Sequence, residues 1–344
     1  MSLPFVSVLI TTYNYGRFIE EAIESVLSQD LPPEQLEVVV VDDGSTDDTA
    51  DRVRKYGSKV HYFRQPNGGQ ASALNLGFSK ARGEIISLLD GDDFFFPGKL
   101  PRVAEAFRQD PGLGMVYHPL LGWYVEANEH RESHYPLVSG SLFENLEKFL
   151  WYAGPGTCAS FRRKFLDRFL PIPEDIRMLA DAYPGCLIPF VAPILALPER
   201  LASYRIHGKN SYQVDESQIP VEVRESRFRL WQIVIDAMRK WLADNGYTRK
   251  QPAVRLFLDR WTVHQQKERF LIDPPGRLRF FWFVLFENYF TSPVQTWKLT
   301  AFNYLSAFSA LVFGYKKAQQ MYEWRKRTME TAQRLFGKTL RAGG

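Results

Sequence analysis

The chain has 344 residues, 45% hydrophobic and 24% charged, a composition that suits a globular enzyme with one large domain and an appended smaller one. Its 43 basic and 39 acidic residues leave a net charge of only +4, so the overall balance does not predict nucleic-acid binding. The two cysteines, Cys158 and Cys186, are spaced neither like a disulfide framework nor like a thiolate metal site, which favours a reducing cytoplasmic location. The apolar run at the N-terminus lacks a preceding basic region and a cleavage pattern, so we expect a buried strand there.

Strand-like apolar runs alternate with helical patterns from residue 6 onward, which predicts a parallel sheet with crossover helices. The predicted strands are 6–11, 37–41, 60–63, 84–89 and 115–117. The predicted helices are 18–27, one that starts near Ser45 and closes before Gly57, 71–81 closed by Gly83, and 99–107. A last α/β portion, 157–207, ends in the extended run 201–206. We therefore expect an α/β fold with a mixed, mainly parallel sheet flanked by helices.

Polar segments end three of these strands: TTYN after the first, DDGSTDD after the second and DGDD after the fourth. In open α/β sheets, ligands bind in the crevice beyond the carboxyl ends of the strands. The three polar segments are therefore expected to meet in one crevice.

The DGDD segment carries three carboxylates, Asp90, Asp92 and Asp93. Carboxylates so close together repel one another unless a cation or hydrogen-bond donors compensate. Hard oxygen ligands favour Mg²⁺ or Mn²⁺, which keep open positions for phosphate oxygens. The alternative is a solvated acidic turn that caps the following helix.

The two earlier segments carry groups suited to a nucleoside. Asp43 is placed to accept a hydrogen bond from a pyrimidine N3–H or from ribose, and Gly44 permits close approach of the backbone. Tyr13 is placed to stack on a base. The alternatives are an ordinary turn for the Asp-Gly-Ser segment and ordinary packing for Tyr13.

The segments VSVLITTYN, VVVVDDGSTDDT and NGGQASALNLGFSKARGEIISLLDGDD resemble, in order and spacing, the N-terminal half of glycosyltransferase family 2. The resemblance is strong over residues 5–100 and weaker to about residue 210. It implies a GT-A fold, inversion at the anomeric carbon, Mn²⁺ or Mg²⁺ as cofactor and a nucleotide-sugar donor, with a UDP-sugar expected.

Several binding residues follow from this resemblance. Thr11, Tyr13 and Asp43 match the family's nucleoside contacts. Asn75 matches a further element of the donor site, but Leu74 stands where the family has an arginine. That departure removes a possible diphosphate contact, so the identity of the donor is less well defined by the motif.

The resemblance also implies the metal-diphosphate site. Asp90 and Asp92 match the family's acidic motif, with Asp92 the first choice for the metal and Asp93 its neighbour in the shell. In the run YRIHG, His207 is implied as a metal ligand and Arg205 as a phosphate contact. The alternative for His207 is a surface or structural role.

Inverting transfer needs a base on the acceptor hydroxyl and no covalent nucleophile. The two candidates are the pair Glu174 and Asp175, and Asp181. We prefer Asp181, which lies 26 positions before His207, close to the spacing that the family shows. The family's usual Glu-Asp is Ala-Asp here, and the alternative for Asp181 is a helix N-cap without a catalytic role.

A domain boundary is predicted near residue 215, where VDESQIP is polar and contains a proline. It separates a GT-A domain, 1–215, from a helical region, 216–344. The helical region carries aromatic patches at 277–290 and 299–315, neither apolar over the about 20 residues that a membrane span needs. Basic residues dominate after them, an arrangement that suits peripheral contact with the inner face of the cytoplasmic membrane, although we favour the alternative that follows. The alternative is a helical core or a homo-oligomer interface.

We therefore predict transfer of a sugar from a nucleoside diphosphate to a hydroxyl of a glycan or lipid-linked glycan acceptor. A nucleotidyltransferase would carry a Gly-rich, Arg-containing loop after its first strand, and TTYNYGR is not that loop. The rival from another class is a non-catalytic GT-A scaffold that binds nucleotide or a glycan-assembly partner. Leu74 and Ala180 are the departures that favour this rival.

Overall fold

The computed structural model describes residues 5–132, 137–142, 156–208 and 221–273, together with positions 276, 278–279, 281–283, 308 and 312. The boundary predicted near residue 215, most of both aromatic patches and the basic run after them lie outside the described residues. By its internal contacts the chain divides into two compact units, Met1–Val254 and Arg255–Gly344. The location of the membrane or oligomer contact therefore stays a prediction.

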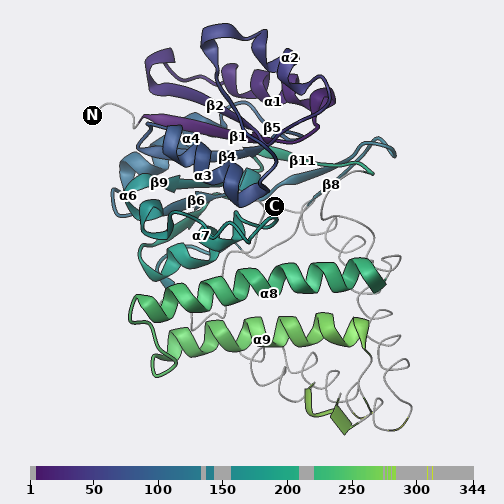
Figure 1. Ribbon diagram of the computed structural model, residues 1–344. Coiled ribbons are helices and arrows are strands. Elements are labelled where there is room, and N and C mark those ends of the chain that lie inside the picture. The colour runs from purple at the N-terminus through teal and green to yellow at the C-terminus, as the bar shows by residue number, and fades with distance from the viewer. Residues whose placement is uncertain are drawn as a thin grey trace, which may run out of the picture. The chain divides into compact units, whose positions relative to one another are not determined.

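A seven-stranded sheet forms the centre of the first unit, with the order β10-β6-β9-β4-β1-β2-β3 (Figure 1). Its strands are β1 (Val6–Thr12), β2 (Leu36–Asp42), β3 (His61–Arg64), β4 (Ile85–Asp90), β6 (Met115–Tyr117), β9 (Ala159–Arg162) and β10 (Ile194–Ala196). Strand β9 runs antiparallel to β4 and β6, and the other neighbouring pairs are parallel. The predicted mixed, mainly parallel α/β sheet is confirmed.

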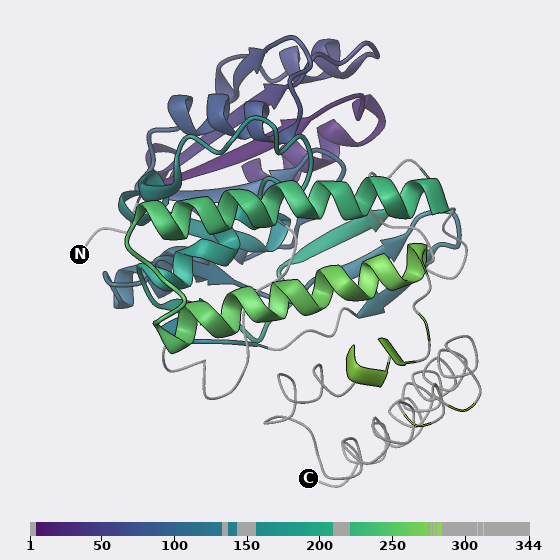
Figure 2. The same cartoon turned by 60° about the horizontal axis from the view of Figure 1, so that its bottom comes forward.

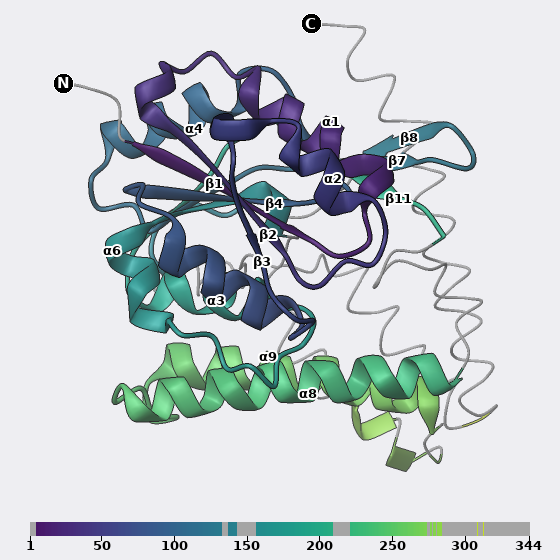
Figure 3. The ribbon, with the colours of Figure 1, turned by 45° about the horizontal axis from the view of Figure 1, so that its top comes forward.

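Helices cover the sheet through apolar faces. These helices are α1 (Gly16–Leu27), α2 (Thr49–Arg54), α3 (Gln70–Lys80), α4 (Lys99–Gln109), α6 (Arg163–Leu166) and α7 (Ala182–Leu187). Figure 3 shows α1 and α2 on one side of the strands β1 and β2 and α3 on the other. In α1 the buried side chains Ile19, Ile23 and Val26 recur at helical spacing and form one apolar stripe. The central strands are thus covered on both faces, as their nearly continuous apolar sequence predicts.

One predicted helix start is wrong. The helix expected from Ser45 begins at Thr49, because Ser45 is held in the preceding loop by the backbone N–H of Asn14, 2.9 Å from its Oγ. Gly57 does adopt the left-handed conformation expected of it, with φ of 56°.

A second, four-stranded sheet has the order β5-β11-β7-β8, with β5 (Phe94–Phe95), β7 (Leu121–Tyr124), β8 (Glu129–Glu132) and β11 (Ala202–Ile206). Strand β5 follows the DGDD segment directly and pairs antiparallel with β11. This pairing carries the end of β11 to the acidic segment, more than a hundred positions earlier in the chain.

Two long helices follow, α8 (Val221–Asp244) and α9 (Pro252–Ile272) (Figure 2). Helix α8 belongs to the first unit and packs there through Trp241, whose indole N–H donates to the carbonyl of Arg168 at 3.0 Å. Within the described part of the chain, no helix combines the length and the apolar character needed to cross a membrane.

Candidate active site

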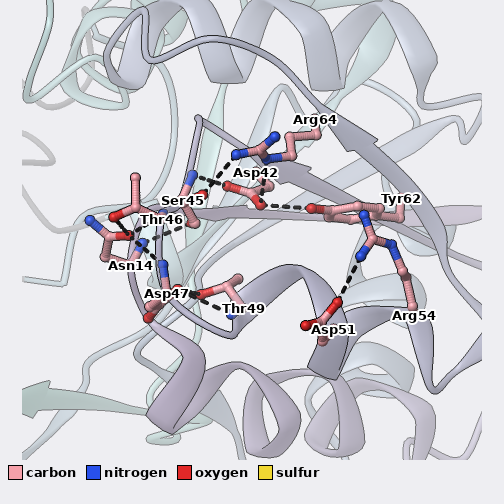
Figure 4. Close-up of polar contacts among 10 residues, drawn as sticks. All are labelled: Asn14, Asp42, Ser45, Thr46, Asp47, Thr49, Asp51, Arg54, Tyr62 and Arg64. Atoms are coloured by element: carbon pink, nitrogen blue, oxygen red, sulfur yellow. Dashed lines mark hydrogen bonds and ion pairs between the residues drawn. The ribbon is translucent and has the colours of Figure 1, made fainter.

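The loops after β1 and β2 are tied together by one asparagine. The Oδ1 atom of Asn14 accepts a hydrogen bond from the backbone N–H of Thr46 at 2.7 Å, and the N–H of Asn14 donates to Ser45 (Figure 4). Asn14 has a positive φ of 57°, a conformation that asparagine tolerates better than most residues. The predicted meeting of TTYN and DDGS is therefore built by side chain–backbone contacts.

Strand β3 supports the same loop from the other side. The buried carboxylate of Asp42 accepts hydrogen bonds from the N–H of Ser45 at 2.7 Å and from the hydroxyl of Tyr62 at 2.6 Å. The guanidinium of Arg64 donates to the carbonyl of Ser45 at 2.8 Å (Figure 4). These contacts fix the loop that precedes α2.

The acidic segment meets the end of β11 at Asp92. Nε2 of His207 lies 3.1 Å from Oδ2 of Asp92, and both side chains are almost fully buried. Tyr15, from the loop before α1, hydrogen-bonds Asp92. Burial, the charge of Asp92 and this hydrogen bond raise the pKa of the Tyr15 phenol, which stays a hydrogen-bond donor.

Asp90 and Asp93 share Thr157 as a partner. The Thr157 hydroxyl lies 2.6 Å from Oδ2 of Asp93 and 3.3 Å from Oδ2 of Asp90, and it accepts the N–H of Asp90 at 3.2 Å. Burial, with the charges of Asp92 and Asp181, raises the pKa of Asp90 to about 8. Where neighbouring carboxylates raise one another's pKa in this way, a bound divalent cation relieves their repulsion.

Asp93, which is predicted to be a metal ligand, contacts protein groups through both of its oxygens. It is fully buried, and its second oxygen accepts the backbone N–H of Arg205 at 2.8 Å. Both oxygens therefore hold protein groups, and Asp93 joins β11 to the acidic segment. Among the described residues no group of three or more His, Cys, Asp or Glu side chains is arranged to hold a metal ion. Asp92 and His207 still suit Mg²⁺ or Mn²⁺, which bind through few protein ligands plus phosphate oxygens.

Asp181 lies near this cluster at the start of α7. Its charge acts on Asp90, and its carboxylate accepts hydrogen bonds from the backbone of Gly156 and from the side chain of Gln70. Burial outweighs these bonds and raises its pKa. Asp181 occupies the N-cap position, but its side chain makes no capping hydrogen bond there. The alternative base, Asp175, is exposed.

Two residues predicted to contact the ligand, Asn75 and Arg205, are engaged by protein partners, and their ligand contacts stay predictions. The Asn75 amide is engaged at both ends by the backbone of Ile172, at 2.8 Å each, and so holds the 172 loop. The Arg205 guanidinium is 1% exposed, donates to the carbonyl of Asp92 at 3.0 Å and pairs with Glu21. Three aromatic rings lie near it, with centroids 4.8–5.1 Å away.

The residues predicted to contact the nucleoside differ in their exposure and in their hydrogen-bond partners. Tyr13 is 45% exposed, as stacking on a base requires. Asp43 is buried, and its oxygens accept the N–H groups of Gly68 and Gly69 at 2.9 and 2.8 Å. The carbonyl of Thr11 accepts the N–H of Gly91 at 2.9 Å. Thr11 therefore joins the first polar segment to the DGDD segment, and Asp43 holds the loop at Gly68 and Gly69, whereas Tyr13 is exposed.

Tyr15, Thr157 and Lys99 are residues at the candidate site that the sequence did not single out. Lys99 is fully buried, and its Nζ donates to the carbonyl of Thr157 at 2.6 Å. Burial lowers the pKa of this amine to about 7. The sequence does carry a signal for the burial of Lys99, because this residue shares the helical spacing of Val103 and Phe107 on the apolar face of α4.

Comparison with known proteins agrees with this geometry. Residues 7–170 match the sequence profile described as Glycosyl transferase family 2. An uncharacterized glycosyltransferase from Nostoc sp. is 35% identical over 221 residues, which are 60% of this chain and 66% of that protein, just under two thirds of its length.

Two solved structures share the fold. Staphylococcus aureus TarS 1–349 with UDP-GlcNAc covers 93% of this chain and 91% of its own, at 18% identity and a TM-score of 0.61. The mannosyltransferase PcManGT from Pyrobaculum calidifontis, with GDP-Man and Mn²⁺, covers 91% and 88% at 20% identity and a TM-score of 0.50. On the sequence profile and the relatives together, residues 7–170 of this chain resemble glycosyltransferase family 2, and the chain shares the fold of these two solved structures.

Proposed function

We propose that the chain transfers a sugar, with inversion, from a nucleoside diphosphate to a hydroxyl of a glycan or lipid-linked glycan acceptor. One observation carries this proposal: Asp92 and His207 lie 3.1 Å apart at the carboxyl edge of the sheet, beside Asp90. Asp181, close enough to act on Asp90, completes the cluster. Acidic groups of this kind at a strand-end crevice suit a diphosphate–metal complex.

Asp181 serves as the base in this proposal. Inverting transfer is a single displacement, in which the acceptor oxygen attacks the anomeric carbon, loses its proton and displaces the diphosphate. A carboxylate with a raised pKa is a better proton acceptor than an ordinary aspartate, and burial raises the pKa of Asp181. Hydrogen bonds from the Gly156 backbone and the Gln70 side chain orient its carboxylate. A single displacement needs no covalent nucleophile, because the acceptor hydroxyl attacks directly.

Asp92 and His207 would hold Mn²⁺ or Mg²⁺. A bound divalent ion supplies positive charge for the leaving diphosphate. Tyr15 donates to Asp92 and so orients it, while Thr157 fixes Asp90 beside it. The Mn²⁺ in PcManGT supports this choice of ion, and the UDP-GlcNAc in TarS supports our proposal of a UDP-sugar donor.

Thermal shift with UDP-GlcNAc, UDP-glucose and GDP-mannose, each with and without Mn²⁺, tests donor binding, because a ligand stabilises the state that binds it. Donor hydrolysis is then compared in Asp92→Ala, Asp181→Ala and Asp175→Ala. We expect loss in the first two and retention in the third, a matched control at the alternative base. Loss of turnover in Asp175→Ala with retention in Asp181→Ala would move the base to Asp175.

The non-catalytic scaffold is separated by the same measurements. A scaffold would bind a nucleotide and show neither hydrolysis nor transfer with any of the three donors. Nucleotide-dependent stabilisation with turnover that requires Asp92 excludes it.

A further inference from the structure

The Asn67–Gln70 segment, NGGQ, links the nucleoside side of the site to the loop that carries Asp181. Asp43 holds this segment by accepting the N–H groups of Gly68 and Gly69. Gly69 has a φ of 89°, and a Cβ there would lie 2.9 Å from Cα of Arg177. Only glycine permits this conformation and this close approach at once. The segment is therefore pressed against the chain just before Asp181.

Gln70, the first residue of α3, contacts that part of the chain through both its side chain and its backbone. Its Oε1 accepts the backbone N–H of Ala180 at 2.9 Å, and its backbone N–H donates to the carbonyl of Arg177 at 2.9 Å. With Oε1 taken by Ala180, the amide NH₂ is the group that faces the carboxylate of Asp181, to which the side chain is hydrogen-bonded. One glutamine thus binds both the backbone and the side chain of the proposed base.

The loop before Asp181 needs such support. Leu179 has a φ of 62°, in the left-handed region that residues with a Cβ rarely adopt. The Ala180 N–H that Gln70 accepts lies one residue after this turn. Without Gln70, no polar contact of α3 would hold Asp181 itself, although the Arg177 side chain still donates to Asn67 at 3.0 Å.

We infer that Gln70 is a positioning residue for Asp181: its amide aims the carboxylate into the site and favours the ionised form that accepts a proton. This inference rests on the proposed role of Asp181 as base. The titratable groups that act on Asp181 from other elements are Asp90 of β4 and Cys186 of α7, and Gly156 contributes a neutral donor. Gln70 is the side-chain donor among these partners. Removing its amide should therefore destabilise the ionised form of Asp181 and raise the pKa of this carboxyl group.

The direct test is the titration of Asp181 in the full chain labelled with ¹³C at aspartate carboxyl carbons, without donor or metal. The Asp181 resonance is identified by its loss in Asp181→Asn. Gln70→Met keeps the length of the side chain and removes the donor, so the midpoint should rise by about one pH unit. Gln70→Glu retains an acceptor for Ala180 but adds a second carboxylate, so its rise should be larger.

Asn75→Leu is the matched control, since it removes two amide hydrogen bonds from the same helix without touching Asp181. It should lower thermal stability and leave the Asp181 midpoint in place. The pH profile of donor hydrolysis should follow the titration, with the ascending limb moved to higher pH in the Gln70 variants alone. UDP affinity in Gln70→Met should stay within about twofold of the unmodified chain.

An unchanged Asp181 midpoint in both Gln70 variants overturns the inference while leaving the proposed function intact. A uniform loss of rate at every pH, equal in Gln70→Met and Asn75→Leu, also overturns it and assigns Gln70 a purely structural role. If Asp181→Asn keeps full activity, the proposed base is wrong, and the positioning role falls with it.

Discussion

Replacing Lys99 by methionine should stabilise the fold, and by an amount that depends on pH. The amine is fully buried and its pKa is lowered to about 7, against about 10.4 in an unfolded chain. Below pH 7 the folded chain therefore carries a buried charge that the unfolded chain holds in water. Between pH 7 and about 10 the unfolded state binds more protons, so the stability of the unmodified chain rises with pH by about 1.4 kcal/mol per unit.

The gain in the free energy of unfolding that Lys99→Met gives over the unmodified chain should therefore shrink as the pH rises. Between pH 7 and pH 9 the decrease should be about 2 kcal/mol, because the Lys99 amine of the folded chain is half-protonated at pH 7. Urea unfolding at both pH values, followed by tryptophan fluorescence, measures this difference. Lys59→Met is the control, because Lys59 is exposed and its replacement should show no such pH dependence.

An advantage of equal size at both pH values would refute the reasoning. It would mean that Lys99 stays protonated when folded, held by the Thr157 carbonyl at 2.6 Å and by the Phe95 ring, whose centroid lies 3.5 Å from Nζ. Lys99 is linked to the candidate site through Thr157, because the Thr157 hydroxyl hydrogen-bonds Asp90 and Asp93. We expect Lys99→Met to lose donor turnover while gaining stability, a common relation at functional positions.

Three further predictions follow from the contacts of the site. Asp92→Asn and His207→Ala should each abolish the Mn²⁺-dependent part of the thermal shift given by UDP, and an undiminished shift in either would remove that residue from the metal site. Donor hydrolysis should rise with pH through a midpoint above the aspartate value of about 3.9, because burial raises the pKa of Asp181 and a base must be ionised; a midpoint at or below that value would contradict this. Arg205→Met should lower stability by roughly 2 kcal/mol, less than for a fully buried pair because Glu21 is 53% exposed, and chemical unfolding would detect a neutral result.

The parts of the fold that sequence predicts well are those fixed by local pattern. The run from Glu37 to Val41 is nearly all apolar because β2 is covered on both faces, and its bounds differ from the structure by one residue at each end. The convergence of TTYN, DDGS and DGDD also follows from sequence, because parallel strands place their carboxyl ends at one edge. The sequence pattern therefore predicted that these three loops meet at one edge of the sheet.

Contacts between distant segments set the rest, and no local pattern contains them. Ser45 carries a good helix-start signal, yet α2 begins at Thr49, because Asn14 and Asp42 hold the loop from outside it. Asn75 sits in the expected motif, but its amide partner lies nearly a hundred positions later in the chain. Motif position predicts which helix a residue belongs to, whereas the partner depends on how distant loops pack.

The end of β11 shows how one spacing serves two tasks. Arg205 and His207 are two positions apart and so point to the same face of an extended chain, where both pack against Phe18 of α1. Arg205 donates to the main-chain carbonyl of Asp92, and Nε2 of His207 meets its carboxylate. The guanidinium of Arg205 is also held by aromatic rings and by Glu21, so it anchors the end of β11 next to the acidic segment. The two-residue spacing of Arg205 and His207 therefore lets one side chain anchor the strand while the other reaches the carboxylate of Asp92.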